Sequence, residues 1–165
     1  MIIKKNYSPI AIVGMACRFS GGANSLEQFW VNLNRGVDEI CEIPESRWDP
    51  RRFYSTNKNK SGKTYVKAGG FLQEDISHFD PMFFGISPRE AEVMDPQQRI
   101  LFEVTWEAIE DAGYQLPYLQ RIKTGVFIGG FCLDHKILNL SPHNQTLINT
   151  HSGAGPLSLQ QHLEW

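Results

Sequence analysis

The chain has 165 residues, which is about one domain or a part of a larger one, since domains average roughly 150 residues. Its 16 Lys and Arg against 18 Asp and Glu give a formal net charge of −2, which lacks the general basicity of a nucleic-acid-binding protein. A hydrophobic fraction of 41% excludes a disordered chain, and the longest apolar run, residues 9–17, is too short to span a membrane. The composition predicts a soluble globular protein without a nucleic-acid or membrane partner.

Cysteine usage and the N-terminus indicate the compartment. The three cysteines are an odd number and do not form a disulfide scaffold, which fits a reducing environment. Lys4 and Lys5 precede the apolar run as in a signal peptide, but residues 18–22 offer no small-x-small cleavage site. We therefore expect a cytoplasmic protein.

The first expected elements are a strand and a helix joined by a glycine turn. Residues 8–16 form a continuous apolar run, which is typical of a strand covered on both faces. Ser25 caps the helix, Gln28 completes a capping box, and Gly36 ends it. One apolar stripe at i, i+3, i+4 and i+7 is made of Leu26, Phe29, Trp30 and Leu33.

A polar and irregular stretch follows from residue 37 to about residue 70, and it is basic between Arg51 and Lys67. Its aromatic residues predict an ordered surface excursion and not a free linker: Trp48, Phe53, Tyr54 and Tyr65. Irregular stretches of this length are uncommon in compact domains and are often functional.

Two further helices and a second strand are expected. Ser87 and Asp95 each begin a helix through a capping box with proline at the first position. The second of these helices runs from Pro96 to Ala112, and apolar residues around most of its circumference predict that it is mostly buried. Residues 125–130 are the second core strand, and no element is expected after about Leu133. Two strands and about three helices do not close a doubly covered sheet, so the pattern indicates an incomplete α/β architecture.

Two segments partly match nucleotide-binding loops. Ser61-Gly62-Lys63-Thr64 ends like a phosphate-binding loop, but Asn57 stands where that motif needs glycine and the following residues favour an extended chain. Gly14, Gly21 and Gly22 follow a strand without the G-x-G-x-x-G spacing, and bulky residues lie between them. We interpret the first segment as a lysine-rich turn and expect no nucleotide at either.

The titratable residues do not form a metal or acid–base site. Glu103, Glu107 and Glu110 share one helical face, which we interpret as solvated because no apolar pocket is indicated that would raise the pKa of a carboxyl. The five histidines show no metal-ligand spacing: His78, His135, His143, His151 and His162. We predict no metal-binding residue in this chain.

Each of the three cysteines is a candidate nucleophile, and a reactive thiol needs a helix N-terminus or a cation to lower its pKa. Cys17 lies beside Arg18 but at the end of an apolar strand, short of the helix cap. Cys132 follows a strand and precedes His135 by three residues. The interpretation for both, and for Cys41, is a buried structural cysteine.

A set of motifs between residues 8 and 130 carries a family resemblance. The segments that match are residues 10–19, 21–22, 29–30, 47–49, 69–72 and 79–80, then with high specificity 83–92 and 94–99, and finally 103, 106–108, 110–113 and 125–129. The most specific read Phe-Phe-Gly-Ile-Ser-Pro-Arg-Glu-Ala-Glu and Met-Asp-Pro-Gln-Gln-Arg. This pattern resembles the N-terminal part of the β-ketoacyl synthase domain of modular polyketide synthases and animal-type fatty acid synthases.

The resemblance implies a thiolase-like fold, which is a layered αβαβα arrangement of two related halves, and here only its N-terminal portion. Members of the family are usually homodimers. They join an acyl chain on a catalytic cysteine to a malonyl-type extender held by the phosphopantetheine of acyl carrier protein, by decarboxylative condensation. The partners implied are acyl carrier protein and the remaining synthase domains, and no cofactor is bound directly.

The family's reactive residues have no counterpart in this chain. Its nucleophile stands in a Thr-Ala-Cys-Ser-Ser context and its two histidines in Glu-Ala-His-Gly-Thr and Asn-x-Gly-His contexts, and none of these occurs here. The resemblance therefore implies no catalytic, cofactor-binding or metal-binding residue, and an inactive chain. We expect residues 8–151 to form a partial ketosynthase domain and residues 152–165 to be a divergent C-terminal tail.

Two functional hypotheses follow. In the first, the chain is a piece of a ketosynthase that is catalytic only with the rest of the domain. In the second, it is a non-catalytic interaction fragment that pairs with a full-length synthase. The second is motivated by the apolar surface expected where the helix from Pro96 to Ala112 loses its covering layer, since large patches of this kind mark interfaces.

Overall fold

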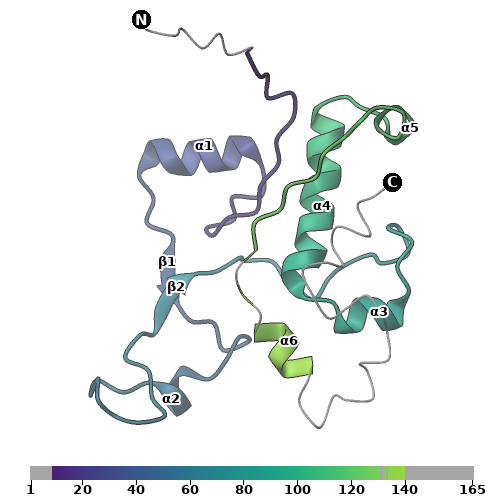
Figure 1. The fold of residues 1–165 in the computed structure, drawn as a ribbon. Helices are drawn as coiled ribbons and strands as arrows, with labels where there is room; N and C mark the ends of the chain where they lie inside the picture. Colours follow the sequence, from purple (N-terminus) through teal and green to yellow (C-terminus); the bar gives the residue numbers. More distant parts are fainter. Residues whose placement is uncertain (1–8, 131, 133, 140–165) are drawn as a thin grey trace, which may run out of the picture.

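The computed structural model describes residues 9–130, 132 and 134–139, and Figure 1 shows their arrangement. The regular structure of these residues consists of helices and one small sheet. The helices are α1 (Leu26–Arg35), α2 (Pro50–Phe53), α3 (Pro88–Val93), α4 (Pro96–Asp111), α5 (Leu116–Leu119) and α6 (Asp134–Asn139). The strands are β1 (Ile40–Glu42) and β2 (Ala68–Gly70).

Local signals determine where the three predicted helices begin and end. The Ser25 side chain accepts a hydrogen bond from the backbone amide of Gln28, and Gly36 closes α1 with a left-handed φ of 60°. Ser87 caps α3 in the same way through the amide of Glu90. Asp95 forms a reciprocal capping box at the start of α4, which ends within a residue of the predicted position. These three helix predictions are confirmed, whereas the expectation of no element after about Leu133 is wrong, since α6 lies there.

The stretch after α1 is ordered, as predicted, but it is not wholly irregular. β1 and β2 pair in antiparallel fashion, with Cys41 opposite Gly69, and they bring the two ends of the excursion together. The prediction of irregular chain up to residue 70 is wrong at both ends. Strands of three residues, one of them Ala-Gly-Gly, carry no alternation of apolar and polar residues from which they could be predicted.

The two predicted core strands are absent. Residues 9–16 and 125–130 form no ladder with any residue that the structure describes, and in Figure 1 they are drawn-out chain. Ile10 is 95% exposed and Phe127 is 96% exposed. The prediction of strands was wrong because a strand exists only through hydrogen bonds to a neighbouring strand, and a hydrophobic run cannot supply that neighbour.

The core lies where α3, α4 and the preceding loop meet. Ile86, Ala91, Met94 and Phe102 form the buried cluster, against which Phe79, Phe84 and Leu101 pack. Of the α4 residues only Gln98 and Phe102 are buried, so the prediction of a mostly buried helix is wrong in degree. The remaining apolar positions of α4 are half-covered because the described chain places no layer over them.

A close approach at Gly14 holds the N-terminal segment against α4. A Cβ atom at Gly14 would lie 2.2 Å from the backbone oxygen of Ala108 and 2.7 Å from the backbone nitrogen of Ala112, so only glycine fits. The next residue is tied as well, since the amide of Met15 donates to the Asp111 carboxylate at 2.9 Å. None of the helices in the described residues is both long and apolar enough to cross a membrane.

Candidate functional site

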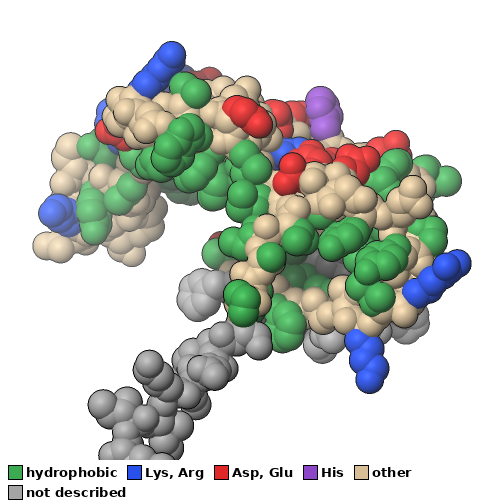
Figure 2. Space-filling view, turned by 90° about the horizontal axis from the view of Figure 1, so that it is seen from above, with side chains coloured by type: hydrophobic (Ala, Val, Ile, Leu, Met, Phe, Trp, Pro, Cys, Tyr) green, Lys and Arg blue, Asp and Glu red, His purple; other side chains and the backbone are tan. Residues whose placement is uncertain are grey.

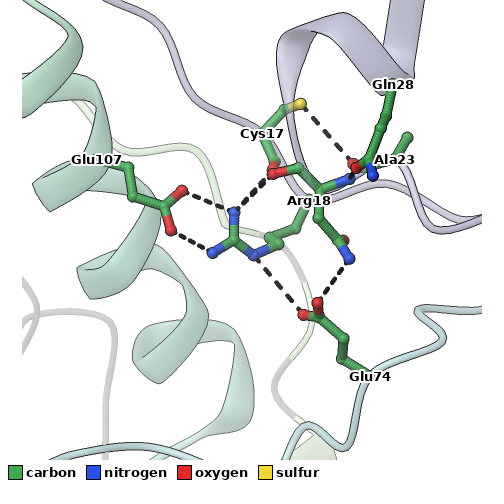
Figure 3. A network of polar contacts seen from close by, with 7 residues as sticks. Cys17, Arg18, Ala23, Gln28, Glu74 and Glu107 are labelled. Carbon is green, nitrogen blue, oxygen red and sulfur yellow. Dashed lines mark hydrogen bonds and ion pairs between the residues drawn. The ribbon is translucent and has the colours of Figure 1, made fainter. Parts of the chain in front are cut away.

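Arg18, which follows the N-terminal segment directly, lies at the centre of a network of polar contacts. Its guanidinium donates to both carboxylate oxygens of Glu107 on α4, one of them at 2.7 Å, and this bidentate pair is drawn in Figure 3. It also donates to the backbone oxygens of Cys17 at 3.0 Å and Asn24 at 3.3 Å. The Arg18 side chain is 14% exposed and that of Glu107 is 39% exposed, so the guanidinium is largely withdrawn from water and the carboxylate is partly open.

Two further carboxylates surround this arginine. Glu74 lies 3.9 Å from its Nε atom and accepts a hydrogen bond from the side-chain amide of Asn24 at 2.6 Å. Glu103 lies one helical turn before Glu107, and burial raises the pKa of its carboxyl, while the charge of Arg18 opposes that shift. The hydrogen bond that Arg18 donates to the Glu107 carboxylate raises the pKa of Arg18, so the guanidinium keeps its charge despite partial burial.

This arrangement joins elements and does not present a reactive group. Arg18 links the N-terminal segment, the turn before α1 and the side of α4 through bonds that use its donors. An open cleft of about 430 Å³ lies beside it, lined by Arg18, Leu72, Glu74, Asp75, Ile76, His78, Ile100 and Glu103. The Arg18 guanidinium is paired with the Glu107 carboxylate through two hydrogen bonds and holds the neighbouring backbone in position. A charged guanidinium neither accepts a proton nor attacks a substrate.

The structure separates the three cysteines considered as nucleophiles. Cys17 is buried, and its thiol faces the backbone oxygen of Ala23 at 3.8 Å, which fits the predicted structural role. Cys41 on β1 and Cys132 are exposed, so the interpretation of these two as buried residues is wrong. Cys41 lies on β1 and Cys132 follows the segment of residues 125–130. No other part of the described chain covers either side chain, so both are exposed to solvent.

No thiol is hydrogen-bonded to an imidazole in the part of the chain that the structure describes. The ring of His135 contacts the backbone oxygen of Val93 at 3.2 Å, and His78 lies 3.7 Å from Asp75 at the surface. The cleft that includes Cys41 contains no histidine, and the cleft that includes His78 contains no cysteine. His143, His151 and His162 lie outside the described residues.

The other candidate motifs have structural explanations. Gly62 forms a turn with φ of 69°, and the Lys63 ammonium donates to the backbone oxygen of Arg52, so residues 61–64 are the predicted lysine-rich turn. The interpretation of the α4 carboxylates as a solvated face is wrong for Glu107, which pairs with Arg18, and for Glu103, which is partly buried, whereas Glu110 is exposed as predicted. Among the described residues no group of His, Cys, Asp and Glu is placed to hold a metal ion.

The pair of Arg18 and Glu107 was not predicted from the sequence. Its partners are 89 residues apart, and no local pattern joins them. One signal was present: Arg18 is the single charge at the end of a long apolar run, and a charge in such a position needs an opposite charge from another element. The acidic stripe of α4 was the nearest source.

Comparison with known proteins decides the family. The family model for the N-terminal domain of β-ketoacyl synthase matches residues 7–159, which is most of the chain. This chain belongs to the β-ketoacyl synthase family. The resemblance given by its motifs is thereby confirmed.

Relatives of this ketosynthase chain are polyketide synthases. A phenolphthiocerol/phthiocerol polyketide synthase of Mycobacterium bovis is 47% identical over 132 residues, which are 80% of this chain and 7% of that protein. The pikromycin polyketide synthase component PikAII of Streptomyces venezuelae is 52% identical over 122 residues, or 73% of this chain and 3% of that protein. The chain therefore spans a small part of the curated relatives that it matches.

Solved structures confirm the fold class. The oxazolomycin ketosynthase domain of Streptomyces albus matches with a TM-score of 0.82 and 39% identity, over 94% of this chain and 27% of that chain. The ketosynthase from module 6 of the bacillaene synthase of Bacillus subtilis matches with a TM-score of 0.55 and 45% identity, over 64% of this chain and 17% of that chain. The fold is thus the N-terminal portion of a thiolase-like α/β ketosynthase domain.

Proposed function

We propose that this chain provides the N-terminal scaffold of a polyketide synthase ketosynthase domain whose reactive residues lie in the rest of the domain. The observation that supports this is the combination of a long family match with the absence of any thiol–imidazole hydrogen bond among the described residues. Arg18 and Glu107 hold the N-terminal segment on α4, which is a positioning role.

The complete domain, in this proposal, makes a carbon–carbon bond. A cysteine thiolate accepts the acyl group from a thioester, and the carrier thiol leaves. A malonyl-type extender then loses CO₂, and the resulting enolate attacks the acyl–cysteine and releases the thiolate, with two histidines stabilising the developing charge. Acyl carrier protein, the remaining synthase domains and a second copy of the domain are the proposed partners.

Phosphopantetheine enters this reaction as the arm of acyl carrier protein, where it carries the extender as a thioester. Neither described cleft that contains Cys41 or His78 combines a thiol with an imidazole, so we assign no residue of this chain to the arm. We further propose a cytoplasmic location, in keeping with the unpaired cysteines, and a domain boundary at residue 151 with a divergent tail over residues 152–165. That tail lies outside the described residues.

An acylation assay tests the proposal. The purified chain is incubated with an acyl thioester of N-acetylcysteamine, and the intact mass is measured, with a complete ketosynthase domain of a relative as the positive control. We expect the control to gain one acyl group and this chain to gain none. Stoichiometric acylation of Cys17 or Cys132, lost in the matching Cys→Ser variant, would show that the chain carries its own nucleophile and would overturn the proposal.

A second candidate function is pairing with a full-length synthase without catalysis. The apolar stripe of α1 favours it, because two of its residues, Trp30 and Leu33, are 61% and 59% exposed. Co-purification of the chain with an intact synthase would support this function. A chain that stays monomeric and unbound in the presence of the synthase would contradict it.

A further inference from the structure

The basic excursion, residues 51–67, is a part of the chain that the proposed function does not use. It contains six Lys and Arg and no Asp or Glu, which leaves 10 basic against 18 acidic residues in the rest of the chain. In Figure 1 it projects beyond the pair of β1 and β2, away from α4. Figure 2 shows Asp and Glu side chains gathered over the middle of the face seen from above, with most of the visible Lys and Arg side chains at its edges. Positive charge is therefore concentrated in one place on an otherwise acidic chain.

The chain does not compensate most of this charge. Two of the six cations form ion pairs at the ends of the excursion, Arg51 with Asp49 at 2.9 Å and Lys67 with Glu42. The other four are exposed and form no ion pair with a described carboxylate: Arg52, Lys58, Lys60 and Lys63. Glu164 is the single acidic residue of the sequence outside the described ranges, and one carboxylate does not balance four cations.

Hydrogen bonds within the excursion hold its backbone in a defined path. The amide of Thr64 donates to the backbone oxygen of Phe53 at 2.8 Å, and the amide of Ser55 donates to that of Thr64 at 2.8 Å. At the turn, the side-chain oxygen of Asn57 accepts from the amide of Asn59 at 3.0 Å. A surface that is ordered before binding loses less conformational entropy when a partner arrives. The four cations are thus presented on a prearranged platform.

Aromatic rings lie among these cations. The Lys58 ammonium is 5.2 Å from the centroid of the Tyr65 ring, and the Arg52 guanidinium is 5.3 Å from that of Phe53. Tyr65 is 54% exposed and Phe53 is 39% exposed. Aromatic residues and Arg are enriched in protein–protein interfaces. The excursion therefore offers contact area as well as charge, which favours a polypeptide partner over a small anion.

We propose that the basic excursion is a docking surface for an acidic segment of another polypeptide, whose carboxylates pair with the four uncompensated cations. Charge complementarity favours this occupant, because the like charges of the excursion repel one another and bound carboxylates relieve that repulsion. A nucleic acid fits less well, since a long polyanion would extend over the acidic remainder of the chain. The inference goes beyond the proposed function and does not depend on it, because the condensation uses no residue of the excursion.

Peptide binding tests the docking surface. The probe is a fluorescein-labelled, alanine-based helical peptide with Glu residues at i, i+4 spacing, and its counterpart carries Gln at the same positions. Binding to the full chain is measured by fluorescence anisotropy in about 20 mM and in about 300 mM NaCl, because salt screens exposed charges. The test variant is the double substitution Lys58→Glu and Lys60→Glu. The matched control is Arg121→Glu and Lys123→Glu, which changes the net charge equally at two exposed residues elsewhere.

We expect saturable one-to-one binding of the Glu peptide in low salt and none of the Gln peptide. The test variant should raise the Kd at least about tenfold, because it replaces two attractive charge contacts by repulsive ones. The control should raise the Kd less than about threefold, and the higher salt concentration should weaken binding at least about fivefold. Lys60→Glu alone should raise the Kd at least about threefold, and it keeps the test independent of the folding of the double variant.

Other outcomes overturn the inference. An equal rise of the Kd in the test and control variants would show a general effect of net charge, and so would equal binding of the Glu and Gln peptides or the absence of saturable binding contradict the docking surface. Tighter binding of a single-stranded DNA of the same charge would assign the excursion to nucleic acid. Dimerisation of the parent chain that is lost in the test variant, measured by analytical ultracentrifugation, would assign it to a second copy. The acylation assay of the proposed function is read separately and changes none of these results.

Discussion

Two regions of this chain are rich in apolar residues and differ in burial. Between residues 79 and 102, aromatic and aliphatic side chains close a core in which Ile86 and Met94 are each 1% exposed. Residues 9–16 and 125–130 contain a larger share of hydrophobic residues, yet Ile10 and Phe127 are exposed. The difference lies in the sequence distance over which each region finds its contacts.

The first region is made of neighbours. The rings of Phe79 and Phe84 stack at 5.3 Å, and Phe84 lies 5.4 Å from Phe102, so that one loop and two consecutive helices satisfy one another. The second region needs neighbouring strands from parts of the sequence that are far away. Such contacts cost loop-closure entropy, and they form only when those parts of the domain are present. Local burial can therefore exist in a piece of a domain, whereas residues 9–16 and 125–130 form no ladder with any described residue.

The largest expected effect comes from emptying the closed core. Phe102→Ala removes a ring that is 2% exposed and contacts Phe79 and Phe84, and it should lower the free energy of unfolding by about 3–5 kcal/mol. Urea unfolding followed by circular dichroism measures the loss. The free energy of unfolding of so small a core is itself only a few kcal/mol, so the variant is expected to be partly or completely unfolded.

The matched change is Phe127→Ala, which removes the same ring from the open region. It should leave the free energy of unfolding of the chain alone within about 0.5 kcal/mol of the parent value, because the ring is already in water. Equal losses in the two variants would mean that the contrast between the regions is not real.

Gly14→Ala tests how the open segment is held. The added Cβ would meet the backbone oxygen of Ala108 at 2.2 Å, and backbone cannot move aside cheaply, so a loss of about 1–3 kcal/mol is expected. Exchange of the Met15 amide should become faster, since its bond to Asp111 depends on the same approach. Gly129→Ala is the control, because nothing lies within 4 Å of a Cβ atom there.

Glu107→Gln weakens the ion pair that joins the N-terminal segment to α4. Arg18 would keep a partner of the same shape without the charge, and the expected loss is about 1–2 kcal/mol, reduced by salt because Glu107 is 39% exposed. Glu74→Gln should cost less than about 0.5 kcal/mol, because that carboxylate is 60% exposed and 3.9 Å away. Equal effects of the two changes would contradict the assignment of Glu107 as the main partner.

The helix starts could be predicted from the sequence because local signals determine them. Ser25, Ser87 and Asp95 were identified as caps because an N-cap acts within three residues of itself. The ion pair of the candidate site and the ladder of β1 with β2 were missed because each joins residues far apart, 89 residues in the case of Arg18 and Glu107. The strand predictions failed for a different reason: the apolar pattern describes the complete domain, of which this chain is part.

The smallest expected effect is a pH dependence at Glu103. Burial raises the pKa of this carboxyl above its ordinary value of 4.5, with Glu107 and Glu74 adding to the shift and Arg18 opposing it. The fold therefore favours the protonated form. The contribution of Glu103 to stability is full below the ordinary pKa and is lost as the pH rises through the raised pKa.

Because Gln does not titrate, Glu103→Gln should be slightly more stable than the parent at pH 7, and the difference should vanish toward pH 3. Urea unfolding across that range measures it. Glu110→Gln, at the exposed end of α4, serves as the control, and a variant that is less stable than the parent at pH 7 would show that Glu103 supports Arg18 more than burial disfavours its charge.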